Sequence, residues 1–400
     1  MVGVCRPLAI GMRTRVFPRI EPAIEGLPGC PYVSREYRLG LWPCGSGGLW
    51  IYSGPPTPTG RSFGPPDPYF QPIMETKRPT NPAAEEILGG YFPVLDHGFV
   101  SLVDYMGSDE DVERAARVSY GYGTRKVSQT RGLVRYLRRH HHTTPSEMVE
   151  LKFHCAMPMF VARQWIRHRT ASVNEYSGRY SLMPLLFYKP DLDHFALQSS
   201  ANQQGRKPEP ASKELYRKAI EHWDRVREEA SDGYRWMIEE EVARELARID
   251  LPLSTYTQWY WKIDLHNLFH FLTLRVDPHA QWEIQEFARV MAGMLKRVAP
   301  LSYEAWIDYN VRAHSMSRGE MDLLRRLLEA DAEGVRPREG GGSLSLESFK
   351  EFGLAPREAR EFIEKLQPTD VPDYELDVSL MRPAEELAAE LEEAVPGSFE

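Results

Sequence analysis

Polar and apolar residues alternate in one segment near the middle of the chain. Apolar side chains occupy every second position of 149–157, and most residues between them are polar. This period is typical of a strand with one buried face. Residues 255–263 are rich in Thr, Tyr and Trp, a composition that predicts a second strand.

Helical spacing of apolar residues marks the segments around these strands. Pro158 suits the first turn of a helix that we expect to run to about Arg169, with Phe160, Val161, Trp165 and Ile166 on its buried face. Apolar residues recur at helical spacing from Leu215 to Val226, and further helices are predicted at 236–248, 265–275 and 279–298, the last with Trp282, Phe287, Val290, Met291 and Met294 inward. The mixture predicts an α+β fold, with helices packed on a mostly antiparallel sheet.

The two ends of the chain differ from this middle part. Residues 1–82 hold 15 of the 31 prolines and 11 of the 29 glycines and show neither the strand nor the helix period, so we expect a disordered N-terminal extension. Met74 is an alternative start, which would make the upstream part an over-extended reading frame. Residues 315–400 carry ten basic and 21 acidic residues and predict an acidic C-terminal extension with short helices at 319–330, 356–365 and 383–394.

Composition excludes several classes of protein. Hydrophobic residues make up 42% and charged residues 26%, as in a globular protein. We expect no transmembrane helix and no signal peptide, because no apolar run is long enough for the former and the first residues lack the pattern of the latter. The four cysteines form no C-x-x-C pair, so a structural zinc site is not indicated and a reducing, cytoplasmic location is expected. Charges nearly balance in the middle part, which argues against binding of nucleic acid.

Residues 163–181 concentrate positive charge beside aromatic side chains. Arg163 and Arg167 share a face of the predicted helix, Arg169 and Arg179 follow, and Glu175 is the single acid of the segment. Two explanations remain open on charge alone. The arginines bind an anionic ligand, or they form surface ion pairs with acids that are distant in the sequence.

The letters of this segment resemble a known signature. Arg167-His168-Arg169, seven further residues, Ser177 and then Arg179-Tyr180 are similar to the motif of flavin-dependent thymidylate synthases, the ThyX family. The resemblance runs over about 91–310 and includes the segments 98–104, 114–119, 144–147, 160–165, 247–252 and 274–283. It implies a ThyX-type fold, with residues 91–314 as the catalytic domain between the two extensions.

The resemblance also implies an activity. Members of this family convert dUMP to dTMP by reductive methylation, with 5,10-methylenetetrahydrofolate as carbon donor and NADPH as reductant through FAD. The active sites would lie between the subunits of a homotetramer, where FAD, dUMP and the folate meet. An alternative is an FAD-dependent NADPH oxidase or reductase that does not act on a pyrimidine nucleotide.

Site residues carry over from the family motif position by position. The resemblance implies that dUMP contacts Gln164, Trp165, Ile166, Arg167, Glu175, Tyr176, Ser177, Gly178, Arg179, Arg248 and Arg275. Arg275 is the implied catalytic residue, placed against a pyrimidine carbonyl where it favours ionisation at N3. Ser177 has no obvious histidine and acid relay near it in the sequence, so we expect it to position substrate and not to act as a nucleophile.

Flavin contacts are implied at Thr144, Arg167, His168, Arg169, Glu175, Asp264, His266 and His270. This chain departs from other branches of the family at Asp264, His266 and His270, where Asn and Arg are usual. His266 and His270 stand one helical turn apart, but the glutamate of an H-E-x-x-H zinc motif is missing, so no metal is expected. Of the run His140-His141-His142, His142 is expected to line the site.

Overall fold

The structure is a computed structural model that describes residues 38–43, 49–54, 80–119, 130–200, 205–330, 334–341, 343, 345, 348–368 and 370–395. The chain divides into two compact units, Met1–Thr76 and Lys77–Glu400. In the first, β1 (Arg38–Pro43) and β2 (Leu49–Gly54) form an antiparallel pair. This hairpin lies within the extension that the sequence predicts to be disordered, and the rest of 1–79 lies outside the described residues.

A five-stranded sheet forms the framework of the second unit. Its order is β3-β4-β5-β9-β6, and every neighbouring pair is antiparallel. The strands are β3 (Tyr91–Val94), β4 (Gly98–Met106), β5 (Glu150–Pro158), β9 (Tyr256–Asp264) and β6 (Ser172–Glu175). The two central strands are those predicted from the sequence, each displaced by about one residue. The α+β fold with an antiparallel sheet is confirmed.

The two faces of the sheet have different character. Phe153 pairs with Trp261 on the buried face. On the opposite face the ring of His154 stacks on that of Tyr260, with centroids 4.8 Å apart. Alternation along β5 and β9 separates these two sets of side chains, as expected for strands with one face against a core.

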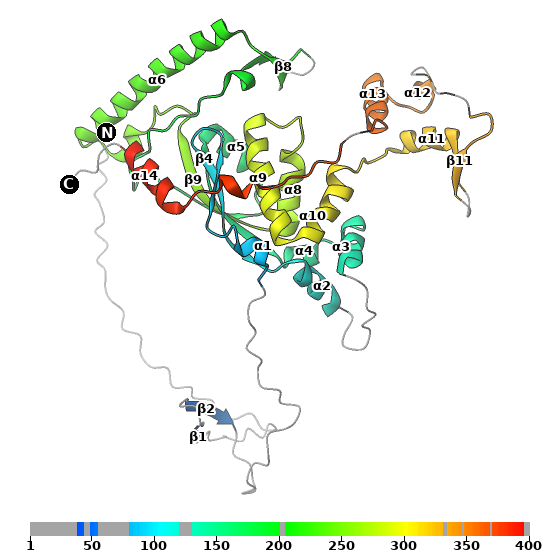
Figure 1. Ribbon diagram of the computed structural model, residues 1–400, viewed down its shortest axis with the longest axis horizontal. Helices are drawn as coiled ribbons and strands as arrows, with labels where there is room; N and C mark the ends of the chain where they lie inside the picture. Colours follow the sequence, from blue (N-terminus) through cyan, green and yellow to red (C-terminus); the bar gives the residue numbers. More distant parts are fainter. Residues whose placement is uncertain are drawn as a thin grey trace, which may run out of the picture. The chain divides into compact units, whose positions relative to one another are not determined.

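Three helices cover the buried face (Figure 1). They are α5 (Met159–Trp165), α8 (Leu265–Arg275) and α9 (Trp282–Val298). The bounds of α8 are those predicted. Helix α9 begins three residues later than predicted, because Asp277 accepts hydrogen bonds from His279 N (2.8 Å) and, through its carbonyl, from Ala280 N (2.9 Å), which makes a turn there.

Helix α5 ends at Trp165 and not near Arg169, so its predicted end is wrong. The chain turns at once, since His168 N donates to Trp165 O at 3.0 Å, and it then enters β6. Ile166 therefore leaves the helical face and is 39% exposed, contrary to its predicted burial. Val161 and Trp165 are buried as predicted, and Phe160 is half-buried.

The predicted helix at 236–248 is also wrong. Helix α6 (Lys213–Glu239) is 27 residues long and contains the first part of that segment. Glu241 then adopts a positive φ of 57°, which ends the helix without a glycine, and a short helix α7 (Arg244–Ala247) follows.

The remaining elements surround this framework. They are α1 (Pro82–Glu85), α2 (Asp109–Val118), α3 (Thr130–Arg139), α4 (Thr144–Glu147), β7 (Ala196–Gln198), β8 (Arg206–Pro210) and α10 (Pro300–Trp306). Beyond them lie α11 (Arg318–Leu327), β10 (Leu328–Ala330), β11 (Val335–Pro337), α12 (Ser348–Glu351), α13 (Pro356–Lys365) and α14 (Ala384–Ala394). Helices α13 and α14 confirm the predictions at 356–365 and 383–394, and α11 confirms the helix at 319–330 except for its last three residues, which form β10.

The C-terminal extension has a small core of its own. Leu323, Phe349, Leu354 and Phe362 are buried together between α11, α12 and α13.

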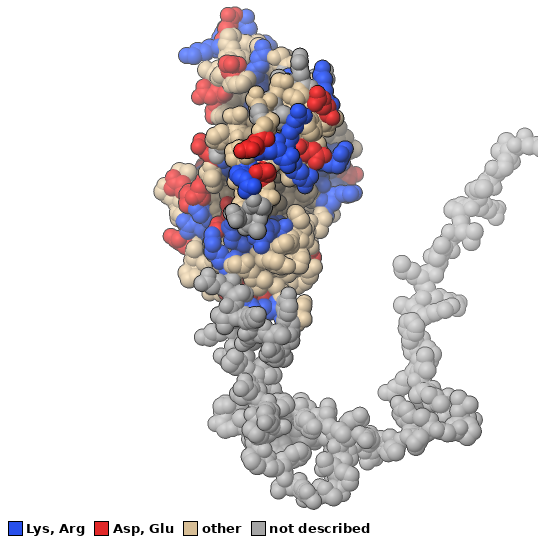
Figure 2. All heavy atoms as spheres, turned by 90° about the vertical axis from the view of Figure 1, so that its right-hand side faces the viewer, with Lys and Arg blue, Asp and Glu red and all other residues tan. Residues whose placement is uncertain are grey.

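On the face of the molecule shown in Figure 2, basic and acidic side chains lie side by side. No helix in the described part of the chain has both the length and the apolar character needed to cross a membrane.

Trp165 provides a test of this core. Its side chain is fully buried against Trp259, Trp261 and Phe271. We expect Trp165→Ala to lower the free energy of unfolding by about 3–5 kcal/mol, because it leaves a cavity among rings that cannot collapse into it. Urea unfolding followed by far-UV circular dichroism measures the change. Ile166→Ala is the control and should cost less than about 1 kcal/mol, since Ile166 is partly exposed. Equal losses in the two variants would contradict this account of the core.

Candidate substrate and cofactor site

The C-terminal end of α8 brings several predicted site residues together. Arg275 is the last residue of the helix, and its Nε donates to Nε2 of His168 at 3.1 Å. Its Nη2 donates to the carbonyl oxygen of Gln164 at 3.4 Å. The ring of His168 also lies edge-on to Phe271 (4.9 Å) and to His270 (5.8 Å). The turn after α5 and the last turn of α8 thus form one group, which we call the Arg275 cluster: Gln164, His168, His270 and Arg275.

Burial controls the charge of this cluster. Desolvation, helped by the nearby Arg275 and His270, lowers the pKa of His168 from its ordinary value of 6.5 to about 4. The imidazole is therefore neutral at pH 7, and the hydrogen bond from Arg275 requires Nε2 to be the acceptor, so the proton is on Nδ1. Desolvation also lowers the pKa of Arg275, but a guanidinium stays charged.

A small polar cavity of about 160 Å³ adjoins the cluster. It lies among the ends of α3, α4 and α8 and is lined by Leu137, Arg138, His141, His142, Thr143, Ser146, His266, Phe269, His270, Thr273 and Asn310. Of the predicted site residues, His142, His266 and His270 line this cavity. His141 also lines it, whereas His140 packs instead on the ring of Tyr136 at 4.3 Å.

Three buried polar atoms of this cavity have no hydrogen-bond partner among the described residues: His266 Nδ1, Arg138 Nη2 and Asn310 Oδ1. Each such atom costs about 1–3 kcal/mol when it is left unpaired. The Arg138 guanidinium lies 3.9 Å from the Phe269 ring centroid, and desolvation lowers the pKa of Arg138 to about 10. The cavity is therefore lined by residues that carry polar groups without a partner among the described residues.

The turn that follows β6 carries a second group of predicted residues. A Cβ on Gly178 would lie only 3.0 Å from Cδ of Arg248 and 2.6 Å from Sδ of Met183, so Arg248 packs directly against this turn. Arg179 Nε lies 2.9 Å from a carboxylate oxygen of Glu245, in α7. We call Ser177, Gly178, Arg179 and Arg248 the Gly178 cluster. Among the described residues, no hydrogen bond or ion pair joins it to the Arg275 cluster.

Ser177 has a local role in the Gly178 cluster. Its Oγ accepts from the backbone N–H of Arg179 at 3.3 Å, and its carbonyl accepts from the N–H groups of Tyr180 and Ser181 at 3.0 Å. No histidine is hydrogen-bonded to its hydroxyl within the described part of the chain. This arrangement favours positioning of a ligand over nucleophilic attack.

The structure gives two predicted acidic ligands definite partners. Oε1 of Glu175 accepts from the hydroxyl of Thr257 at 2.8 Å. The carboxylate of Asp264 accepts from the N–H of Asn267 at 2.9 Å and from its Nδ2 at 2.7 Å. Asp264 is thus the N-cap of α8, and the cap explains why an aspartate suits this position without any cofactor.

The remaining predicted residues differ in exposure. Trp165 is fully buried, so its side chain packs in the core, and a contact of this residue with dUMP would be through its backbone. Tyr176 is half-buried, and its hydroxyl donates to the carbonyl of Leu182. The side chains of Thr144, Arg167 and Arg169 are exposed, and neither arginine forms an ion pair with a described residue.

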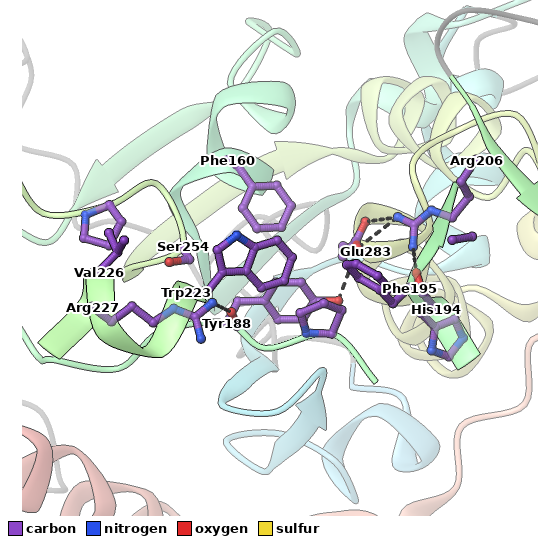
Figure 3. Close-up of a pocket in the computed structure, with 13 residues that line it drawn as sticks. Phe160, Tyr188, His194, Phe195, Arg206, Trp223, Val226, Arg227, Ser254 and Glu283 are labelled. Atoms are coloured by element: carbon purple, nitrogen blue, oxygen red, sulfur yellow. Dashed lines mark hydrogen bonds and ion pairs between the residues drawn. The ribbon is translucent and has the colours of Figure 1, made fainter. Parts of the chain in front are cut away.

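A further pocket is not indicated by the sequence pattern. It has a volume of about 450 Å³ and lies between α6, the 188–196 segment and the start of α9 (Figure 3). Both oxygens of the buried Glu283 accept from Arg206 Nη2, at 2.9 and 2.8 Å, and Phe160, Tyr188, Phe195 and Trp223 supply aromatic walls. The sequence did offer a signal: Glu283 is an acid at an inward position of the amphipathic helix α9. A buried carboxylate needs a basic partner, so this position indicates a buried ion pair nearby.

This pocket adjoins the Arg275 cluster along two helices. Phe160 of the pocket and Gln164 of the cluster are one turn apart on α5. Oε1 of Gln281, the N-cap of α9, accepts from the side chain of Gln164, and Glu283 follows two residues later. The Arg206–Glu283 pair therefore fixes the beginning of α9 beside the cluster.

Comparison with known proteins connects this geometry to a family. The sequence model described as "Thymidylate synthase complementing protein" matches residues 101–301. The flavin-dependent thymidylate synthase of Gluconobacter oxydans is 52% identical over 259 residues, which are 64% of this chain and 85% of that protein. That of Ruegeria pomeroyi is 47% identical over 291 residues, 72% and 91% of the two chains.

A solved structure is also similar. The UMP/dUMP methylase PolB from Streptomyces cacaoi, bound with 5-Br dUMP, aligns with a TM-score of 0.50 at 32% identity. The alignment covers 55% of this chain and 98% of that chain. All predicted site residues, from Thr144 to Arg275, lie within the matched range 101–301.

The neutral state of His168 predicts a dependence of stability on pH. Its folded pKa lies below the ordinary value, so the unfolded chain binds the extra proton first. The contribution of the neutral His168 to the free energy of unfolding is fully present above about pH 6.5 and is lost as the pH falls towards 4. Between pH 6.5 and 4 we expect the melting temperature of His168→Gln to fall less than that of the wild type, because the Gln side chain can accept a hydrogen bond from Arg275 but does not titrate. Parallel curves for the two proteins would contradict the proposed neutral histidine.

Proposed function

This chain belongs to the flavin-dependent thymidylate synthase family, and we propose that it methylates dUMP at C5 with the Arg275 cluster and the Gly178 cluster as its two halves of the active site. The observation that carries the proposal is the pair Arg275–His168, a charged guanidinium held by a neutral imidazole beside a polar cavity. The similar methylase from Streptomyces cacaoi, whose structure holds 5-Br dUMP, supports a pyrimidine nucleotide as the substrate.

The nucleotide phosphate is assigned to the Gly178 cluster. Arg179 and Arg248 present guanidinium groups at the turn, and Gly178 lets the chain approach closely because it has no side chain. Arginine suits a phosphate because its planar fork donates two parallel hydrogen bonds and does not lose its charge. Arg167 and Glu175, with Ser177 and the exposed backbone of Tyr176 and Ile166, complete the proposed contacts.

The uracil ring is assigned to Arg275. His168 and the Gln164 carbonyl hold Nε and Nη2 of the guanidinium, and among the described residues Nη1 has no partner. That free donor is proposed to face a pyrimidine carbonyl oxygen. A fixed positive charge there stabilises the negative charge that develops when N3 loses its proton, which makes C5 more electron-rich. A neutral His168 assists because it holds the guanidinium through a hydrogen bond and, unlike a carboxylate, does not neutralise its charge.

The polar cavity is a suitable place for part of the flavin. Unpaired His266 Nδ1, Arg138 Nη2 and Asn310 Oδ1 match the acceptors and donors at the edge of a polar heterocycle. We propose that His266, His270 and His142 hold that edge, with Thr144, His168, Arg167 and Arg169 near its anionic parts. When bound, FAD supplies the redox chemistry, with NADPH as reductant and 5,10-methylenetetrahydrofolate as the source of the carbon.

The lack of any hydrogen bond or ion pair between the two clusters among the described residues supports sites shared between subunits. Each cluster is held by its own elements, β6 and α7 in one case and α5 and α8 in the other. We propose a homotetramer in which one subunit's Gly178 cluster faces another subunit's Arg275 cluster. Residues 91–314 form the proposed catalytic domain, and the scarcity of cysteine supports a cytoplasmic location.

Release of tritium from 5-tritiated dUMP tests the reaction, because the new carbon replaces the hydrogen at C5. We expect release that requires both methylenetetrahydrofolate and NADPH. Arg275→Ala should lower the rate at least about 100-fold, through loss of charge stabilisation, while bound flavin is retained. Arg217→Ala, at an exposed ion pair on α6, is the control and should match the wild type.

Two outcomes would contradict the proposal. Normal tritium release by Arg275→Ala would remove Arg275 from the mechanism. Flavin reduction by NADPH in the wild type that is indifferent to dUMP, with no release of tritium, would favour the oxidase or reductase alternative.

Mixing two inactive variants tests the shared site. Arg275→Ala retains an intact Gly178 cluster, and Arg179→Ala retains an intact Arg275 cluster. If each site combines clusters from two subunits, random exchange of equal amounts should restore about a quarter of the sites. The measurement is dUMP-dependent tritium release after refolding the two proteins together and separately. No recovery in mixed oligomers, verified by native mass spectrometry, would place both clusters of a site in one chain.

A further inference from the structure

The last described segment of the chain, residues 370–395, crosses the catalytic unit and touches it at three places. Figure 1 shows it in red, passing over α9 and ending in α14. It lies outside the matched range 101–301. Below, this segment is called the strap.

The first contact fixes the strap on α9 and α10. Lys296 of α9 pairs with Asp373 at 2.7 Å and also with Glu375. The hydroxyl of Tyr303 accepts from Tyr374 N at 2.8 Å. Leu376 is 9% exposed, and a Cβ on Gly293 would lie 3.0 Å from its Cβ, so the strap packs directly on the helix backbone.

The second contact covers the outer edge of the sheet. Tyr91 N donates to Arg382 O at 3.1 Å, and Arg382 N donates to Tyr91 O at 2.8 Å. The two residues form an antiparallel bridge on β3, whose edge is otherwise outermost in the sheet. The Arg382 side chain pairs with Glu386 (3.2 Å) and Glu390 (2.7 Å), which ties the bridge to α14.

The third contact reaches the segment after the Gly178 cluster. At the end of α14 the carbonyl of Ala394 accepts from Leu185 N at 3.0 Å. Two residues before Leu185, Met183 is buried, its N–H donates to the hydroxyl of Tyr234 at 2.9 Å, and its sulfur packs on Gly178. A continuous set of contacts therefore joins α9, through the strap, to the turn that carries Ser177 and Arg179.

We propose that the strap is a positioning segment for the Gly178 cluster. Among the described residues it forms no hydrogen bond, ion pair or ring contact with the Arg275 cluster, so we expect its effect to be on nucleotide affinity and not on the reacting ring. Held at Leu376 and Arg382, it keeps Leu185 and Met183 in place beneath Gly178. When the strap detaches, the turn with Arg179 and Arg248 samples more conformations, and the phosphate binds a site that is no longer preorganised. The inference rests on the proposed function, because it assumes that this turn binds dUMP.

The experiment uses a matched pair of full-length variants. Leu376→Asp puts a charge into the buried contact with α9, whereas Leu380→Asp puts the same charge at a strap position that is 59% exposed. We expect Leu376→Asp to raise the KM for dUMP and its calorimetric Kd about tenfold, with kcat and flavin content unchanged. Leu380→Asp should match the wild type. Leu376→Ala, a milder change at the same position, replaces Leu376→Asp if that variant does not fold.

Each outcome decides the matter. A Leu376 variant that melts at a lower temperature but keeps the wild-type Kd for dUMP would show that the strap only stabilises the fold, and the proposal would be withdrawn. A fall in kcat with unchanged KM would likewise contradict it. If the wild type itself does not bind dUMP, the proposed function fails instead, so the two failures are distinguishable.

Discussion

The stacking of Trp165 on Phe271 is the contact on which the Arg275 cluster depends. The two rings lie 4.9 Å apart in the core, and both side chains are fully buried. Trp165 ends α5 and is three residues from His168, while Phe271 is one helical turn before Arg275. A fixed relation between the rings therefore fixes the relation between imidazole and guanidinium, which come from segments 107 residues apart. An apolar contact in the core sets the geometry of a polar site, because rings at this packing density cannot slide without opening a cavity.

The buried and exposed parts of the site differ in how they carry positive charge. Burial lowers the pKa of His168, so the buried part of the cluster carries one positive charge where a protonated imidazole would place two side by side. Arg167 and Arg169, which form no ion pair with a described residue, are exposed and therefore hydrated in the absence of a ligand. These two arginines thus keep their positive charge available to an anion, and as exposed groups they avoid the cost of burying a charge unpaired.

Hydrophobic spacing predicted β5 and α8, and a composition rich in Thr, Tyr and Trp predicted β9, because each of these signals lies within one short segment of the chain. It failed where the chain turns without a glycine or proline. Helix α5 stops at Trp165 through a local hydrogen bond, and α6 stops where Glu241 adopts a positive φ. Motif letters brought Arg275, His168 and Gln164 together correctly, but they do not distinguish a side chain that binds from one that packs, as Trp165 shows. The Arg206–Glu283 pair joins residues 77 apart, a separation that no local pattern encodes.

The two clusters differ in how strongly the surrounding chain restrains them. A cluster held by two core helices needs no help from outside, since Trp165 and Phe271 already restrain it. The Gly178 cluster instead sits on β6, an edge strand whose residues are all exposed, and on the four-residue helix α7. So short a helix contributes little stability of its own, and an edge strand is restrained on one side only. Additional restraint is therefore most effective at this cluster, which is where the strap ends.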